Sequence, residues 1–451
     1  MAVDMKKMME IKCFNQAFNG NGIVKYNTKE YEIHGLLKDE VGLFSLDKKN
    51  VKCPLKLEQI VKKSKNRVNP FCYNHEICGG CQYQHMSYPY ELELKHNYLK
   101  DIFKNFKDVT IPPILGMPSP NYYRAKCQMT YKMSKAKRVV CGFYEEGTHN
   151  IVPVTDCKIQ AKKATEVINA LNEVLTKNKI EPYNEKTKKG IIRHVLLRYG
   201  YNSKEILLCL VTNGDFFPGS RNVVNDLVKK ELGITTIVQN INSRNTSIVL
   251  GDKERVLYGK GYIYDTIGSK KFIISSRSFY QVNPLGMQLL YKRALEVAQI
   301  KKDEIVLDTY CGVGTIGIIA SSNAKQVYGV ELNRDAYKDA CQNARLNNIK
   351  NITFYNDDST KFMQNLAKTN EHIDVLIMDP PREGSTKEFI EAIGSLKPKR
   401  IVYVSCDPKT LERDLYQISR VGYHLDALEG VDMFPRTFNV ECVCRLERKS
   451  K

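Results

Sequence analysis

Two apolar runs late in the chain end in polar turns that carry reactive side chains. One run ends in Asp379-Pro380-Pro381-Arg382 and the other in Ser405-Cys406-Asp407-Pro408. The carboxyl ends of neighbouring parallel strands meet at one edge of a sheet, so we expect Asp379 and Cys406 to face the same crevice. A lone cysteine is more often a buried structural thiol, but its place in a polar turn favours Cys406 as a nucleophile.

A nucleophilic thiol needs activation and a partner. A free thiol, with a pKa of about 8.5, is only a few per cent ionised at neutral pH. A helix that begins near Pro408 would help to lower the pKa of Cys406. Glu441, in the late run Phe438-Asn439-Val440-Glu441-Cys442-Val443, is the candidate base, because this run can add a strand beside the crevice. Asp379 would orient a cofactor or the ring that is modified.

A turn that contains glycines follows the first apolar strand of the same segment. Glu304-Ile305-Val306-Leu307-Asp308 leads into Thr309-Tyr310-Cys311-Gly312-Val313-Gly314-Thr315-Ile316-Gly317. Glycines at such a place let the backbone approach a ligand at a helix N-terminus. The Gly-x-Gly-x-x-Gly spacing alone also fits a dinucleotide. A dinucleotide turn, however, starts its glycines at the strand end, whereas here Asp308 closes the strand and three residues precede Gly312.

Carboxylates follow at the ends of later strands. Glu331 could accept hydrogen bonds from both ribose hydroxyls of an adenosyl group, and Asp357 and Asp358 would lie near its adenine. This ordered set resembles class I S-adenosylmethionine-dependent methyltransferases. The Asp379-Pro380-Pro381-Arg382 turn differs from the Asn/Asp-Pro-Pro-Tyr/Phe loop of relatives that methylate exocyclic amines. Carbon is therefore the expected acceptor.

Carbon 5 of uracil suits a thiol paired with a carboxylate. This carbon is not nucleophilic enough to accept a methyl group unaided. Addition of the Cys406 thiolate to carbon 6 would turn carbon 5 into an enolate-like nucleophile. Glu441 would then remove the proton on carbon 5, so that the thiol can leave.

A cluster of cysteines lies near residue 75. Three thiols fall within ten residues in Cys72-x5-Cys78-Gly79-Gly80-Cys81, out of 14 cysteines in the chain. With no export signal these cysteines should be reduced, and soft thiolates so close together indicate zinc or an iron–sulfur cluster. The second Cys-x2-Cys pair of the common zinc sites is missing. Cys157 is the first candidate for a fourth ligand, and His75 and His85 are alternatives.

Three segments with different patterns must position these residues. Residues 1–66 contain short alternating runs broken by Gly, Asn and Asp, which predict a small, OB-like antiparallel β-barrel. Residues 67–268 mix strands and helices and predict an α+β central domain. Residues 269–451 alternate apolar strands with helix-length segments, which predicts an α/β fold with a doubly wound parallel sheet.

The charge of the chain favours a polyanionic partner. The formal net charge is +19, from 69 Lys and Arg against 50 Asp and Glu. From Asp47 to Arg67 there are eight basic residues and two acids, and from Asn121 to Arg138 there is no acid among interleaved tyrosines. Such stretches offer phosphate contacts and stacking platforms for RNA.

The sequence gives no reason to expect a membrane protein. Its longest apolar runs are far shorter than a membrane span, and the first residues lack the apolar core of a secretory signal. We therefore expect a cytoplasmic protein without a membrane partner.

Together these motifs resemble, over nearly the whole chain, the RNA (uracil-5-)-methyltransferases, and specifically their 23S ribosomal RNA branch. In that branch a TRAM barrel, an iron–sulfur central domain and a methyltransferase domain occur in this order. The resemblance implies transfer of a methyl group from S-adenosylmethionine to carbon 5 of a uridine in 23S ribosomal RNA. We expect the enzyme to act as a monomer.

The resemblance also assigns residues. It implies that Cys406 is the nucleophile and Glu441 the base, and that a [4Fe–4S] cluster is held by Cys72, Cys78, Cys81 and Cys157. Phe279-Tyr280-Gln281-Val282-Asn283 matches the Phe-x-Gln-Val-Asn signature of the family. The implied contacts to the cofactor or substrate are Gln281, Tyr310, Glu331, Asp358 and Asp379, although Asp358 stands where some relatives carry Asn.

Three other functions are weighed against this one. The tRNA branch makes 5-methyluridine in the T-loop and typically lacks both the cluster cysteines and the barrel. A non-catalytic RNA-binding factor would need neither Cys406 nor Glu441. A radical methylase would use a tight Cys-x3-Cys-x2-Cys loop, whereas five residues separate Cys72 from Cys78.

Overall fold

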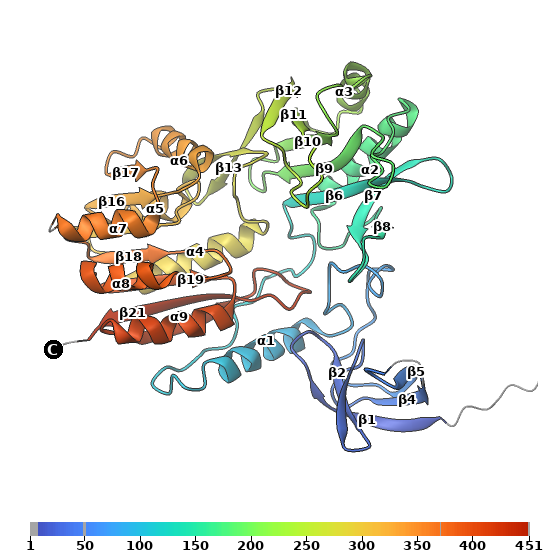
Figure 1. Ribbon diagram of the computed structural model, residues 1–451, viewed down its shortest axis with the longest axis horizontal. Coiled ribbons are helices and arrows are strands. Elements are labelled where there is room, and N and C mark those ends of the chain that lie inside the picture. The colour runs from blue at the N-terminus through green and yellow to red at the C-terminus, as the bar shows by residue number, and fades with distance from the viewer. Residues whose placement is uncertain (1–7, 48–50, 370, 450–451) are drawn as a thin grey trace, which may run out of the picture.

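A computed structural model describes residues 8–47, 51–369 and 371–449. Its strands form four sheets, of five, seven, two and seven strands, arranged as Figure 1 shows. Within the basic run from Asp47 to Arg67, residues 48–50 lie outside the described residues, as do residues 1–7 at the start of the chain.

The first sheet is antiparallel and has the strand order β3-β2-β1-β4-β5. Its strands are β1 (Met9–Gln16), β2 (Gly22–Tyr26), β3 (Lys29–Ile33), β4 (Val41–Leu46) and β5 (Leu55–Lys62). Strand β1 pairs with both β2 and β4, which lets the sheet enclose a small core that includes Cys13, Val24 and Phe44. The alternating runs in the sequence correspond to β2, β3 and β4. That this module is TRAM-like stays a prediction.

A seven-stranded sheet forms the middle of the chain, in the order β12-β11-β10-β9-β6-β7-β8. Its strands are β6 (Lys126–Met133), β7 (Val139–Tyr144), β8 (Ile151–Pro153), β9 (Ile192–Tyr199), β10 (Ile206–Thr212), β11 (Ile234–Ile241) and β12 (Lys253–Tyr258). Helices α2 (Lys162–Lys177) and α3 (Ser220–Val228) bury apolar residues against one face of it. A two-stranded hairpin, β13 (Tyr262–Ile267) and β14 (Lys270–Ser275), leads from this sheet to the last one.

The last sheet has the order β17-β16-β15-β18-β19-β21-β20. Its strands are β15 (Ile305–Thr309), β16 (Gln326–Val330), β17 (Ile352–Tyr355), β18 (Val375–Met378), β19 (Arg400–Ser405), β20 (Tyr423–Val431) and β21 (Glu441–Arg448). Strands β15 to β19 are parallel, and β21 joins antiparallel to both β19 and β20. The predicted α/β, doubly wound sheet is confirmed, with β20 and β21 as an antiparallel extension.

Helices cover both faces of this sheet. They are α4 (Pro284–Ala298), α5 (Thr315–Ala320), α6 (Arg334–Leu346), α7 (Ser359–Lys368), α8 (Lys387–Leu396) and α9 (Pro408–Arg420). Along β19, Val402 and Val404 pack with α4 to α6, whereas Ile401 and Tyr403 pack with α7 to α9. This alternation explains why the strands read as continuous apolar runs.

Helix α1 (Tyr88–Ile102) ties the early part of the chain to the last sheet. It lies between the small N-terminal sheet and α9 (Figure 1), and its Leu99 belongs to the core of the last sheet. The buried ammonium of Lys95 donates to Asp432 at 2.7 Å and to Glu91 at 2.9 Å. These contacts hold the loop that leads from β20 to Glu441.

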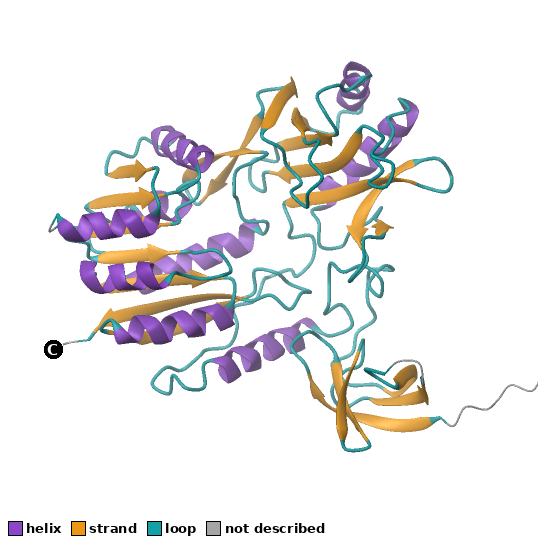
Figure 2. Cartoon of the chain, in the orientation of Figure 1, coloured by secondary structure: helices purple, strands orange, loops and turns teal. Residues whose placement is uncertain are grey.

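Loops run through the region where the three larger sheets meet (Figure 2). The boundaries at residues 66/67 and 268/269 stay predictions. In the described ranges 8–47, 51–369 and 371–449, no helix combines the length and the apolar character that crossing a bilayer requires.

Candidate active site

A cavity of about 520 Å³ opens at the carboxyl ends of the parallel strands of the last sheet. Six of the predicted catalytic and cofactor residues line it: Gln281, Tyr310, Glu331, Asp379, Cys406 and Glu441. They come from the ends of β15, β16, β18 and β19, from the start of β21 and from the segment before α4. Residues that are 160 positions apart in sequence, such as Gln281 and Glu441, therefore meet in one crevice.

The glycine turn after β15 shapes one wall of this cavity. Tyr310 and Gly312 have positive φ angles of 58° and 56°, and a side chain added at Gly312 would project into open space. The carboxylate of Glu331 accepts hydrogen bonds from the backbone N–H of Gly312 at 2.9 Å and of Asn333 at 2.7 Å. Glu331 is thus fixed in position at the end of β16, as a ligand for a polyhydroxyl group requires.

Asp308 supports the turn from below. Its Oδ2 accepts from the backbone N–H of Gly317 at 2.8 Å, while its buried Oδ1 has no partner in the described part of the chain. Burial raises the pKa of Asp308 to about 8. An unpartnered buried carboxyl oxygen in a residue that lines a cavity is costly unless a ligand satisfies it. The arrangement fits the amino and hydroxyl groups of S-adenosylmethionine.

The signature segment before α4 is held from two sides. The carbonyl of Val282 accepts from the backbone N–H of Ala125 at 2.7 Å, and Asn283 caps α4 by accepting from Gly286 at 3.0 Å. The side chain of Gln281 hydrogen-bonds Tyr291 of α4. These contacts direct Gln281 into the cavity.

Asp358 occupies a different place from the other predicted residues. It is the N-cap of α7, where its Oδ1 accepts from the backbone N–H of Lys361 at 3.0 Å. It is not among the residues that line the cavity. A contact between Asp358 and the cofactor stays a prediction.

Cys406 and Glu441 are brought together by strand pairing. Ser405, the last residue of β19, pairs with Cys442 of β21. Cys406 directly follows Ser405 and Glu441 directly precedes Cys442, so the two residues lie at the same end of the two strands. Helix α9 begins at Pro408, as the sequence predicts, and Asp407 caps it by accepting from Lys409 and Thr410, each at 3.0 Å. Cys406 is half-buried and Glu441 is buried.

The pKa of the Cys406 thiol is raised, whereas the sequence predicted that the N-terminus of a helix would lower it. Burial raises the pKa of Cys406 to about 11, and the nearby Glu441 adds to the rise. Burial likewise raises the pKa of Glu441 to about 8, with a further contribution from Asp379, whose own pKa is raised to about 7. A half-buried thiol flanked by two carboxyl groups favours the neutral form more than the start of α9 favours the thiolate.

Arg382 is a site residue to which the sequence assigned no role. Its guanidinium lowers the pKa of Cys406 by its charge and by a hydrogen bond, and its charge also lowers the pKa of Glu441. Its position three residues after Asp379, in a turn already placed at the crevice, was the available signal. Lys126 also lines the cavity, and burial lowers its pKa to about 8.

A second cavity, of about 350 Å³, contains all four predicted cluster cysteines: Cys72, Cys78, Cys81 and Cys157. Gln84, Arg124 and Gln160 also line it, and each has a buried polar atom without a partner among the described residues. Burial raises the pKa of Cys81 to about 12, with contributions from the other three thiols. His75 lines the cavity too, whereas His85 does not.

The separation of these thiols bears on what they could bind. Among the described residues, no three of these sulfur atoms lie within 4.8 Å of one another. Tetrahedral zinc, with Zn–S bonds of about 2.3 Å, would place its sulfurs roughly 3.8 Å apart. The four thiols are therefore not spaced as the ligands of one zinc ion in this structure.

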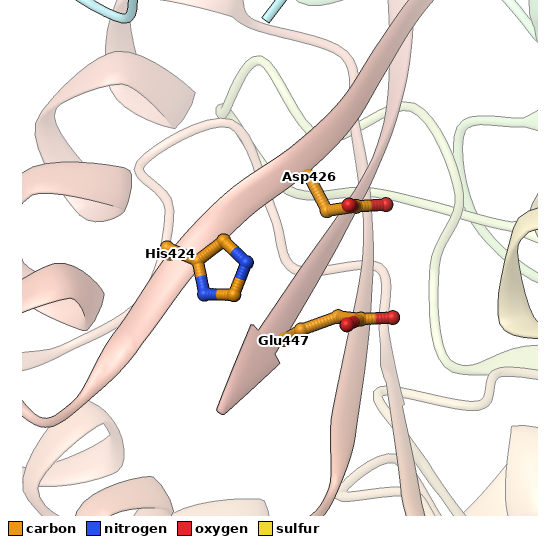
Figure 3. Close-up of side chains that lie close together, drawn as sticks. All are labelled: His424, Asp426 and Glu447. Carbon is orange, nitrogen blue, oxygen red and sulfur yellow. The ribbon is translucent and has the colours of Figure 1, made fainter. Parts of the chain in front are cut away.

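One group in the described ranges does have metal-like spacing, at the outer edge of the last sheet. His424, Asp426 and Glu447 lie close together on β20 and β21 (Figure 3). Arg445 already donates from Nε to Asp426 at 2.7 Å and pairs with Glu447 at 3.6 Å. An arginine that pairs with both carboxylates offsets part of their charge and makes this a surface ion-pair cluster.

Comparisons with known proteins agree with this site. The family model for tRNA (uracil-5-)-methyltransferases matches residues 87–449. A protein from Oceanobacillus iheyensis described as an uncharacterized RNA methyltransferase is 39% identical over 435 residues, covering 95% of this chain and 94% of the relative. One from Clostridium tetani with the same description is 40% identical over 427 residues, covering 94% and 93%.

A solved structure matches nearly the whole chain. It is the tRNA (uracil-54, C5)-methyltransferase of Pyrococcus abyssi in complex with S-adenosyl-L-homocysteine, with 25% identity, a TM-score of 0.75, and coverage of 97% of this chain and 99% of that one. The fold, the cavity and these similarities define an S-adenosylmethionine-dependent methyltransferase that acts on RNA. The chain belongs to the tRNA (uracil-5-)-methyltransferase family.

Proposed function

We propose that the protein methylates carbon 5 of a uridine in 23S ribosomal RNA through a covalent adduct between Cys406 and uracil. The observation that carries the proposal is the strand pairing that places Cys406 beside Glu441 in the cavity that also holds Glu331 and Gln281. A thiol and a carboxylate at one methyl-transfer site match the needs of a ring carbon that must first be activated.

Cys406 forms the first bond. Its sulfur adds to carbon 6 of uracil, and the electron pair of the carbon 5–carbon 6 double bond moves to carbon 5 and the carbonyl at carbon 4. The thiol has a pKa of about 11 in the free protein, so it needs help to ionise. The positive charge of Arg382 stabilises the thiolate that forms this bond. Carbon 5 is then the nucleophile, and S-adenosylmethionine supplies the methyl group that it takes.

Glu441 completes the reaction. It removes the proton from the methylated carbon 5, the double bond re-forms, and the bond between carbon 6 and the Cys406 sulfur breaks. A pKa of about 8 suits a base that must accept a proton from carbon near neutral pH and release it again. Gln281, fixed by Tyr291, and Glu331, fixed by two backbone N–H groups, would hold the methyl donor.

Trapping tests the adduct. RNA containing 5-fluorouridine has no proton at carbon 5 for Glu441 to remove, so the adduct should persist as a band of retarded mobility that requires S-adenosylmethionine. The Cys406→Ala variant should give no such band. Glu441→Gln should accumulate adduct even on ordinary RNA. A band of equal intensity with Cys406→Ala would overturn the mechanism.

The choice of RNA has two candidates. The order of barrel, cysteine-rich central segment and methyltransferase segment supports 23S ribosomal RNA, by its resemblance to that branch. A uridine in tRNA is the second candidate, because the solved structure that matches 97% of this chain is described as a tRNA methyltransferase. Unmodified 23S ribosomal RNA and tRNA transcripts, each incubated with methyl-labelled S-adenosylmethionine, separate the two. Label in tRNA alone would overturn the ribosomal assignment.

The four cysteines of the second cavity are proposed to hold a [4Fe–4S] cluster. Four thiols that line one cavity support this assignment, together with the resemblance to the ribosomal RNA branch. Arg124 and Lys126 in the wall would balance the negative charge of a thiolate-bound cluster. Anaerobic reconstitution should give about four irons per chain and a broad absorption band in the violet-to-blue part of the visible spectrum. The Cys157→Ala variant should lose both the iron and the band. Stoichiometric zinc without iron would refute it.

A further inference from the structure

The open face of the central sheet carries a groove that the proposed reaction does not use. It has a volume of about 580 Å³, and its walls include Tyr144, His149, Tyr183, Lys186, Arg193 and His194. We propose that this groove binds a second nucleotide of the RNA substrate, outside the uridine that is methylated. The proposal rests on the proposed function in one respect, namely that the substrate is RNA.

The groove is connected to the catalytic cavity by one strand. Side chains alternate along β6, so Lys126, Gln128 and Thr130 share a face while Cys127 and Met129 point into the core under α2. Lys126 lines the catalytic cavity, and Thr130 lines the groove. Four residues of strand span about 13 Å, a distance that a few nucleotides of an extended strand cover.

Two buried polar side chains, Arg193 and His194, line the groove. Arg193 is 5% exposed; its Nη1 donates to the carbonyls of Asn242 and Arg244, each at 2.7 Å, but its Nε has no partner in the described part of the chain. His194 is 8% exposed and shares a hydrogen bond of 3.1 Å between its Nδ1 and Thr130 Oγ1. Burial lowers the pKa of His194 to about 4, so a neutral ring offers Nε2 to a base edge.

Aromatic rings line the groove and could stack on a base. Tyr144 is 38% exposed and meets His149 edge to face at 5.9 Å between ring centroids. The ring of Tyr183 is packed under the guanidinium of Arg193 at 4.7 Å, which fixes both groups. Stacking on an exposed tyrosine binds any base, and the nearby cation suits its phosphate.

The charge around the groove matches RNA. The half-buried Lys132 and the exposed Lys186 line it, and further exposed basic residues lie in the turns that follow β6 and Tyr183, at positions 135, 137, 138, 188 and 189. Glu185 is the acid among the lining residues. A concave site with buried donors, an open aromatic ring and a basic rim fits a nucleotide better than it fits an acidic peptide, which would leave Tyr144 and the edge of His194 unused.

Exposed side chains allow a test that leaves the core intact. Tyr144→Ala should weaken binding of the 23S ribosomal RNA transcript by about tenfold in a filter assay, as loss of one stacked base does. Lys186→Ala should weaken it less and lower the dependence of log Kd on log salt by about one. Lys229, an exposed lysine at the C-cap of α3, lies with this helix on the opposite face of the sheet, and Lys229→Ala should bind like the wild type.

Photocrosslinking gives an independent readout. With p-benzoylphenylalanine in place of Tyr144, crosslinks should fall on one nucleotide at a fixed distance from the methylated uridine. The same crosslinker at position 229 serves as the control. The proposal would be overturned if the crosslinks from position 144 were as scattered as those from position 229, or if both groove variants bound with Kd values within twofold of the wild type. Binding needs no methyl transfer, so a protein that binds RNA through the groove without methylating uracil refutes the proposed function alone. If the wild type prefers tRNA, the same comparison is made with that RNA.

Discussion

Ser405 of β19 is the register partner of Cys442 of β21. This antiparallel pair places Cys406 just beyond one strand end and Glu441 at the start of the other, on the same side of the sheet. A slip of one residue in β21 would turn Glu441 to the opposite face. The geometry between nucleophile and base is therefore set by backbone hydrogen bonds.

Variants at Arg382 and Glu441 should change the reactivity of Cys406 in opposite directions. Arg382→Gln removes a charge that lowers the pKa of the thiol, and Glu441→Gln removes one that raises it. Between pH 8 and pH 9, where Glu441 carries its charge and Cys406 is still largely protonated, the rate of alkylation by iodoacetamide follows the thiolate fraction. It should fall several-fold in the first variant and rise in the second. Mass spectrometry of the Cys406 peptide measures it, with Cys341 as the internal control, and changes of the same sign would contradict the electrostatic account.

Glu441 should make the folded protein less stable as the pH rises. Its folded pKa is about 8, whereas an unfolded carboxyl group has a pKa of about 4.3, so the folded state binds more protons between these values. Stability is thus lost as the pH rises through this window and is constant above it. The Glu441→Gln variant should gain more in Tm over the wild type at pH 8.5 than at pH 5. An equal gain at both values would show that Glu441 ionises normally.

Glu331 should contribute to binding of the methyl donor. Its carboxylate is already fixed by the backbone N–H groups of Gly312 and Asn333, so little ordering is needed when a ligand donates to it. Loss of hydrogen bonds to a charged group costs about 1.5–3 kcal/mol, so Glu331→Ala should raise the Kd for S-adenosylmethionine about 10- to 100-fold. Isothermal titration calorimetry measures this, with the exposed Asp303→Asn as the control. An unchanged Kd would remove Glu331 from the cofactor site.

Lys95 should be critical for stability although it is far from the cavity in sequence. Lys95→Met removes the cation that the buried Glu91 and Asp432 share and leaves Glu91 a longer ion pair, of 3.5 Å with Arg436, so it should cost about 3–5 kcal/mol of unfolding free energy. Lys104→Met breaks only an exposed pair with Asp101 and should cost less than about 1 kcal/mol. Denaturant unfolding compares the two. Similar losses in both variants would mean that the buried triad does not stabilise the fold.

The sequence predicted most of the last sheet because its parallel strands are short apolar runs that end in polar turns. Cys406, Asp379 and Glu331 could be placed at one crevice since parallel strands share a direction. Glu441 was harder, because its position depends on an antiparallel pairing that adjacent residues do not reveal. Strand β20, whose buried residues alternate irregularly around a bulge near Asp426, was not anticipated.

Contacts between distant segments were beyond the sequence. The ion pair of Lys95 with Asp432 and the effect of Arg382 on Cys406 depend on side-chain directions that no local pattern specifies. Asp358 is a residue for which the local sequence supports two roles, a contact to the cofactor and a helix N-cap before Ser-Thr-Lys. In the structure it caps α7. A carboxylate near a strand end could serve either role, and only the fold shows which neighbours it has.

The triad of Lys95, Glu91 and Asp432 also bears on how the chain is made. Lys95 and Asp432 are 337 residues apart, so most of the protein emerges from the ribosome before the helix meets its partner. Until then Lys95 lacks one of its two acidic partners, and Asp432 completes the triad. Since domains tend to fold in order of synthesis, this chain keeps its active site unfinished until its final strands are translated.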